Sequence, residues 1–107
     1  MLIILYLFTK PDKIKETCII CAPDLVIEIL SPSTKFHDKG RKFVKYKEAR
    51  VQEVWFVDPT EYLVEVVTRK GGLYDLDMYS MGDKLTVGIL PELTISIAEI
   101  FTETEDN

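Results

Sequence analysis

The sequence has few cysteines and histidines and no long apolar run, so it offers little for a zinc site, a disulfide or a membrane span. Among its 107 residues there are two cysteines, one histidine and five glycines. No apolar run approaches the roughly 20 residues that a membrane-spanning helix needs. The apolar stretch 2–8 lacks the basic start and the small-residue cleavage site of a signal peptide. There is also no glycine-rich phosphate loop and no internal repeat. We therefore expect a cytoplasmic chain with no membrane partner.

The two cysteines, Cys18 and Cys21, form a single C-x-x-C. A structural zinc site needs four ligands, and a redox motif needs a thioredoxin-like βαβ setting. Only His37 is available as a further nitrogen ligand. Both cysteines are therefore expected to be reduced thiols that behave as small hydrophobic side chains.

The composition, with 47% hydrophobic and 29% charged residues, is that of one globular domain spanning 1–107. Apolar or alternating patterns predict strands, and helical spacing of Phe43, Tyr46 and Ala49 predicts one main helix. The glycine pair after Lys70 predicts a hairpin. The expected fold is α/β, with a mixed sheet. The expected strands are 2–8, 23–30, 53–57, 62–68 and 73–79, and the expected helices are 35–49 and 96–101.

Glu28 is the first candidate functional residue, because it interrupts the apolar run 25–30. A buried carboxylate should be paired, protonated or bound to a metal ion. The alternative is an edge strand that exposes Glu28 to water. Strand alternation puts Asp24 on the same face, roughly 13 Å away. The two carboxylates could border one cleft but not chelate one ion, and a solvated aspartate is ordinary at a strand entrance.

Basic residues are concentrated in one segment of an acidic chain. Residues 35–50 hold seven lysines and arginines against two acidic residues, a net charge of +5. The rest of the chain carries −10, which leaves −5 overall. Such a segment can hold phosphate groups locally, although a solvated helix face has the same pattern.

Within this segment, helical spacing places Lys42 at the border of the face that Phe43 and Tyr46 must bury. Lys42 can therefore point toward the sheet, whereas Lys39, Arg41 and Lys45 are predicted to stay outside. A lysine near a strand carboxylate is one half of a metal-dependent site that cleaves phosphodiesters. An ion pair of Lys42 with Glu28 or Asp38 is the alternative.

Residues 22–34 (APDLVIEILSPST) resemble the signature of the Uma-two family of predicted restriction endonucleases, in the PD-(D/E)xK nuclease superfamily. The resemblance continues through Asp38, Lys42 and Tyr46 and through residues 54–59 (VWFVDP). It covers nearly the whole chain from about Lys10 onward.

The resemblance implies a restriction-endonuclease-like fold and a Mg²⁺-dependent DNA endonuclease. Glu28 matches a metal ligand of the family, and Asp24 is a further candidate metal ligand. Leu30 occupies the position of the superfamily's usual lysine, and Lys42 matches the helix lysine that is thought to replace it. DNA would be held through the basic helix 35–50.

One feature of the family is missing. Its members begin well upstream, and the aspartate on the preceding strand would fall near Ile3 or Ile4. Asp12 lies in the following turn and is not its equivalent. The domain is therefore expected to be incomplete at the N-terminus, with an uncovered sheet edge that favours a homo-oligomer. The alternative function is a non-catalytic remnant or a self-associating interaction module.

Overall fold

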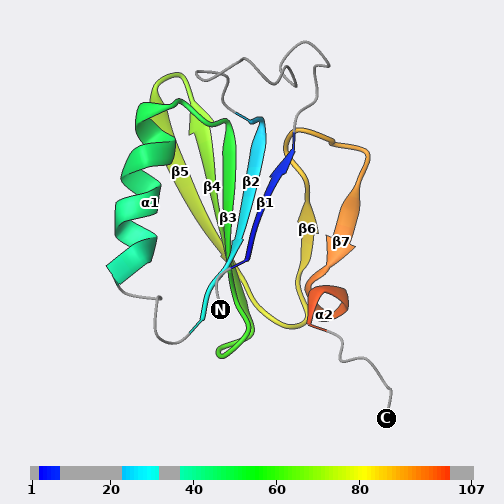
Figure 1. Cartoon of the computed structure of the whole chain (residues 1–107). Coiled ribbons are helices and arrows are strands. Elements are labelled where there is room, and N and C mark those ends of the chain that lie inside the picture. The colour runs from blue at the N-terminus through cyan, green and yellow to red at the C-terminus, as the bar shows by residue number, and fades with distance from the viewer. Residues whose placement is uncertain (1–2, 8–22, 32–36, 102–107) are drawn as a thin grey trace.

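The computed structural model describes residues 3–7, 23–31 and 37–101. Along these ranges, two strands precede one long helix, and five further strands and a short helix follow it (Figure 1). The elements are β1 Ile3–Leu7, β2 Leu25–Ile29, α1 His37–Glu48, β3 Glu53–Asp58, β4 Leu63–Lys70, β5 Leu73–Tyr79, β6 Lys84–Thr86, β7 Thr94–Ser96 and α2 Ile97–Ile100.

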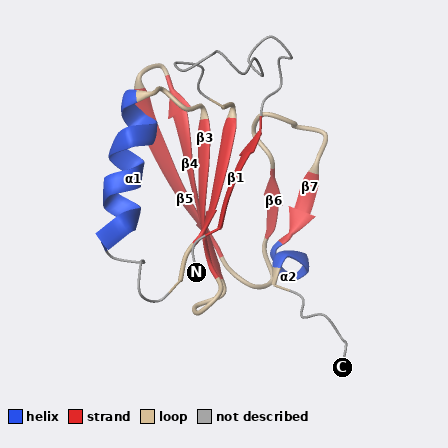
Figure 2. Ribbon diagram, in the orientation of Figure 1, coloured by secondary structure: helices blue, strands red, loops and turns tan. Residues whose placement is uncertain are grey.

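The first five strands form one mixed sheet in the order β1-β2-β3-β4-β5. The pair β2–β3 is parallel and is connected through α1, whereas every other neighbouring pair is antiparallel. Strands β6 and β7 form a separate antiparallel pair. The helix α1 lies on one side of the molecule, and β6, β7 and α2 lie on the other (Figures 1 and 2). The described part of the chain is thus a three-layered α/β structure.

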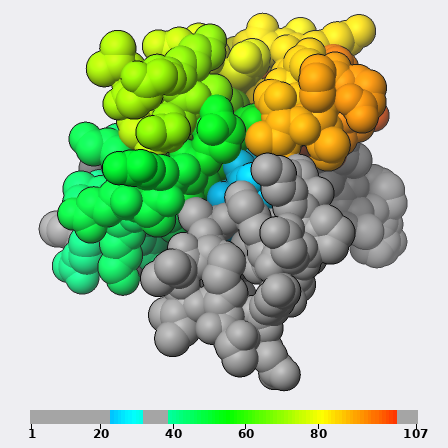
Figure 3. Space-filling view, turned by 90° about the horizontal axis from the view of Figure 1, so that it is seen from above, coloured from blue at the N-terminus to red at the C-terminus, as the bar shows by residue number. Residues whose placement is uncertain are grey.

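Two hydrophobic clusters fill the spaces between these layers. On the α1 side, Phe43 and Tyr46 pack against a cluster formed by Val26, Leu30, Val51, Val54, Phe56 and Val67. On the other side, buried residues of the sheet pack against Leu85, Val87 and Ile97. Both faces of the parallel pair β2–β3 are therefore covered, which is the reason that these strands are nearly continuous apolar runs. Seen from above, residues 23–31 (cyan) show only a small area between green and orange segments (Figure 3).

The strand and helix predictions are confirmed to within a few residues. Gly71 and Gly72 have φ of 57° and 88°, a pair of left-handed residues that a two-residue hairpin between β4 and β5 requires. The closing helix begins after Ser96, whose backbone N–H donates to Glu99 Oε1 at 3.1 Å. The sequence did not predict the pair β6–β7, because these strands have only three residues each.

Some sequence predictions cannot be compared with the fold. Cys18, Cys21 and Asp12 lie outside the described residues. Neither of the two described helices has the length and apolar character needed to cross a membrane.

Candidate active site

Glu28 is buried at the interface between the sheet and α1. Its exposed fraction is 0%, and its Oε2 atom accepts a hydrogen bond from the Tyr46 hydroxyl of α1. The predicted burial of this carboxylate is confirmed, and the alternative of a water-exposed edge position is wrong, but the residue of α1 that bonds it is Tyr46 rather than the lysine that the sequence predicted. The bond to Tyr46 was not predicted. The available signal was the helical spacing that made Tyr46 part of the face that α1 must bury against the sheet.

Glu28 belongs to a row of residues that crosses the sheet. It pairs with Phe56 of β3, and Phe56 pairs with Glu65 of β4. Because strands lie about 4.8 Å apart, the backbones at Glu28 and Glu65 are roughly 10 Å apart, with the Phe56 ring position between them. On the other side of Glu28, its partner in β1 is Ile4. The strand position directly opposite Glu28 therefore carries no carboxylate.

Lys39 reaches the sheet, contrary to the sequence prediction that it stays outside. Its Nζ atom lies 2.5 Å from Glu65 Oε1 and 5.4 Å from the centroid of the Phe56 ring. The reason is helical phase: Lys39, Phe43 and Tyr46 are separated by four and three residues and so share one face of α1. Glu65 is therefore engaged by a lysine from the helix.

Lys42 is half-buried, as expected for a residue at the border of the packed face. Among the described residues it forms no ion pair, so the alternative of a Lys42–Glu28 pair is not observed. Asp24 lies at a bend just before β2 and is also half-buried. The geometry thus brings Glu28 and Tyr46 together, whereas the roles predicted for Lys42 and Asp24 stay predictions.

The residues at Glu28 fit a magnesium ion only if a substrate phosphate supplies part of its ligands. Mg²⁺ is commonly held by one or two carboxylates together with waters and the phosphate oxygens of a substrate. Glu28 is suited to be one such carboxylate, and Glu65 is already bound to Lys39. The described residues contain no cluster of three or more His, Cys, Asp or Glu side chains that could hold a metal ion by themselves. A Mg²⁺ ion at Glu28 would therefore depend on phosphate oxygens for further anionic ligands.

A second buried carboxylate, Glu53, has a structural role that the sequence analysis missed. Its exposed fraction is 1%. It accepts hydrogen bonds from Trp55 Nε1 at 2.7 Å and from the backbone N–H groups of Gly88 and Ile89 at 3.3 and 3.1 Å. The carboxylate thereby ties the loop after β6 to β3. The available signal was the i, i+2 spacing of Glu53 and Trp55, which puts both on one face of a strand.

The mixed sheet, its crossover helix α1 and the buried glutamate on β2 define an α/β protein with a restriction-endonuclease-like fold. The Uma2 (Uma-two) family, described as "Putative restriction endonuclease", matches residues 9–98. The chain belongs to this family.

A solved structure agrees with this assignment. The chain is similar to a protein from Anabaena variabilis ATCC 29413 described as "a putative nuclease belonging to DUF820", with 27% sequence identity and a TM-score of 0.62. The similarity covers 75% of this chain and 44% of the Anabaena protein. The chain thus spans less than half the length of that relative. A search of the curated proteins found no match.

Proposed function

We propose that the chain is a Mg²⁺-dependent DNA endonuclease, in which Glu28 is a metal ligand and Lys42 is the catalytic cation. The observation that supports this proposal best is the burial of Glu28 on an inner strand, directly beneath the basic helix α1. A carboxylate in this position is costly to retain for stability alone, because burial removes its hydration. Membership of the Uma2 family supports the same conclusion.

The roles of the residues follow from their positions. A bound Mg²⁺ ion supplies a Lewis acid for the phosphodiester and lowers the pKa of a bound water. Because Glu28 is 0% exposed and its Oε2 atom accepts the Tyr46 hydrogen bond, a metal ion reaches the carboxylate only after the side chains around it move. Lys42, half-buried at the edge of the same interface, supplies positive charge where the phosphoryl group becomes more negative. Asp24, at the entrance of β2, borders the approach to Glu28.

The basic segment 35–50 is the proposed contact for the DNA backbone. Among the described residues of this segment, the exposed cations are Arg41, Lys45 and Lys47 on the helix and Arg50 just after it. A local excess of positive charge on an acidic protein directs a polyanion to this face and away from the rest of the surface.

Nicking of supercoiled plasmid DNA tests the proposal. The full chain is expected to nick the plasmid with Mg²⁺ and to lose this activity in excess EDTA. Lys42→Ala is expected to lower the rate about 100-fold, as is typical when a charge that stabilises a transition state is removed. Lys84→Ala removes the same charge from β6, on the opposite side of the sheet, and is the matched control. Wild-type activity in Lys42→Ala would reject its catalytic role.

A second candidate function is a self-associating module, and the surface of β5 favours it. This edge strand of the sheet exposes 74% of Leu73, 58% of Leu76 and 53% of Met78. Strand alternation puts Leu76 and Met78 on one face and Leu73 on the other, and an exposed edge with apolar side chains favours pairing between copies. A self-associating module needs no catalytic activity. In this case the copies of the chain would form a homo-oligomer through β5.

Light scattering over a wide concentration range tests self-association. The wild-type chain is expected to give a mass above that of the 12.3 kDa monomer. The double variant Leu76→Lys/Met78→Lys is expected to return it to the monomer, because two charges on an edge strand oppose pairing. A monomeric wild-type chain at all concentrations would exclude this module.

A further inference from the structure

A groove on the α1 side of the sheet carries positive charge that the proposed catalytic residues do not use. It has a volume of about 660 Å³ and lies between the C-terminal part of α1 and the β4–β5 hairpin. Lys47 and Arg50 line it from the helix side, and Arg69 lines it from β4. Its floor includes Phe43 and Tyr74, and the described residues that line it include no acidic side chain.

The three cations are not neutralised by neighbouring carboxylates. Among the described residues, the ion pairs are Lys39–Glu65 and Lys70–Asp75, and neither includes a cation of this groove. Lys47 Nζ lies 5.8 Å from the centroid of the Phe43 ring, which is a weak contact. Three like charges facing one cavity repel one another, and an anion between them removes that repulsion.

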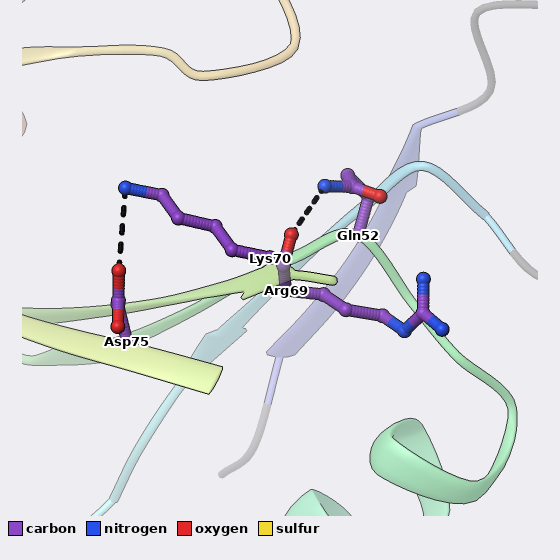
Figure 4. A network of polar contacts seen from close by, with 4 residues as sticks. All are labelled: Gln52, Arg69, Lys70 and Asp75. Atoms are coloured by element: carbon purple, nitrogen blue, oxygen red, sulfur yellow. Dashed lines mark hydrogen bonds and ion pairs between the residues drawn. The ribbon is translucent and has the colours of Figure 1, made fainter. Parts of the chain in front are cut away.

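Arg69 is held in place by its backbone. Its N–H donates to Gln52 O at 2.8 Å, and the Gln52 side-chain Nε2 donates to Arg69 O at 2.7 Å. The side chains of Arg69 and Lys70 extend in opposite directions, and only that of Lys70 meets Asp75 (Figure 4). Gln52 is therefore a positioning residue that fixes the point from which the Arg69 guanidinium extends.

Arg50 occupies a position that normally favours glycine. Its φ is 60°, and the bonds from Arg50 N to Lys47 O and from Val51 N to Tyr46 O form a Schellman motif at the end of α1. An arginine in this left-handed conformation is strained, and such strain is concentrated at functional sites. Arginine at this position thus places a positive charge at the groove, although glycine would end the helix with less strain.

Tyr74 supplies an additional donor at the groove. Its hydroxyl is buried and has no hydrogen-bond partner among the described residues. The ring is fixed by an edge-to-face contact with Phe43, at 5.8 Å between centroids. Buried hydroxyl groups are nearly always hydrogen-bonded, so a ligand oxygen would complete the bonding of this group once the side chain shifts toward the groove.

We propose that this groove binds a backbone phosphate of DNA, at a site separate from Glu28. Guanidinium groups suit phosphate oxygens because they offer paired N–H donors. Arg69 lies four residues along β4 from Glu65, whose backbone is roughly 10 Å from that of Glu28, so the groove lies roughly 16 Å from Glu28. This separation equals about four to five base-pair rises along the axis of a duplex. The proposal rests on DNA being the substrate and defines where the bound strand leaves the active site.

Fluorescence anisotropy with a short labelled duplex in EDTA tests the site. Arg69→Ala and Arg50→Gly are each expected to weaken binding about fivefold near 100 mM salt and to lower the salt slope by about 0.9. Lys70→Ala, next to Arg69 but paired with Asp75, is expected to bind as the wild type does. Because no cleavage is required, an inactive enzyme would leave this result interpretable.

Arg50→Gly separates a binding role from a structural one. Glycine suits the left-handed position, so this variant is expected to keep the wild-type Tm or to raise it by roughly 2–5 °C while it loses affinity for the duplex. Unchanged affinity in both arginine variants would overturn the proposal, as would a fall in the Tm of Arg50→Gly that matches its loss of binding. A titration with inorganic phosphate distinguishes a site for a DNA backbone phosphate from a site for the free ion. Phosphate-induced NMR shifts at Arg69, without any effect of the variants on duplex binding, would assign the groove to free phosphate and overturn the DNA assignment.

Discussion

Glu28→Gln is expected to reduce Mg²⁺-dependent nicking about 100-fold while the fold is preserved. Glutamine has nearly the same volume as glutamate, and its oxygen can still accept the hydrogen bond that the Tyr46 hydroxyl donates. The substitution therefore removes the negative charge needed by a metal ion and leaves the packing in place. Plasmid nicking measures the activity, and circular dichroism measures the Tm.

Glu65→Gln is the matched control for Glu28→Gln. It removes the same charge from the same row of the sheet, where Glu65 pairs with Lys39 rather than with Tyr46. Its nicking rate is expected to stay within about twofold of the wild type, because Glu65 is engaged by Lys39 and has no part in the proposed metal site. Equal rates for the wild type and Glu28→Gln would remove Glu28 from the active site.

Glu53→Ala is expected to destabilise the fold strongly. The substitution removes the acceptor for three N–H groups, those of Trp55, Gly88 and Ile89. A buried donor that is left unsatisfied costs about 1–3 kcal/mol, and the Trp55 donor is buried whereas those of Gly88 and Ile89 are partly buried and cost less, so a total loss of about 3–5 kcal/mol is expected. This corresponds to a fall in Tm on the order of 15 °C or more for a domain of this size. Thermal unfolding followed by circular dichroism measures it.

A pair of glycine variants tests the same contact without removing the carboxylate. A Cβ atom at Gly88 would lie 2.7 Å from Glu53 Oε1, so Gly88→Ala is expected to lower the Tm by displacing the carboxylate from its donors. Gly40→Ala, within α1, meets nothing within 4 Å and is expected to stabilise the protein by about 1 kcal/mol. A Tm of Gly88→Ala at or above the wild-type value would contradict the account of Glu53.

Much of the fold could be predicted because its strongest signals are local. Continuous apolar runs define β2 and β3, alternation defines β5, and the pair Gly71-Gly72 defines the turn between β4 and β5. The pairing of β2 with β3 across α1 follows from the usual need for a crossover between parallel strands. The pair β6–β7 was missed because its stability comes from packing against distant residues of the other hydrophobic cluster.

The candidate site was predictable only in part, because periodicity defines a face but not a contact. The pattern identified Glu28 as buried and Lys42 as a border residue. It could not determine that Tyr46 meets Glu28 or that Lys39 meets Glu65, since both contacts depend on the rotation of α1 over the sheet. The groove of Lys47, Arg50 and Arg69 joins two elements that are distant in sequence, so no local pattern indicates it.

Binding of Mn²⁺, a paramagnetic substitute for Mg²⁺, examines the role of Glu28 without relying on turnover. The EPR signal of free Mn²⁺ is followed as wild-type protein, Glu28→Gln or Glu65→Gln is added, each with a duplex that carries an uncleavable phosphorothioate. We expect the wild type and Glu65→Gln to bind one Mn²⁺ per chain, and Glu28→Gln to bind at least about tenfold more weakly. Equal binding of Mn²⁺ by the wild type and Glu28→Gln would contradict a metal site at Glu28.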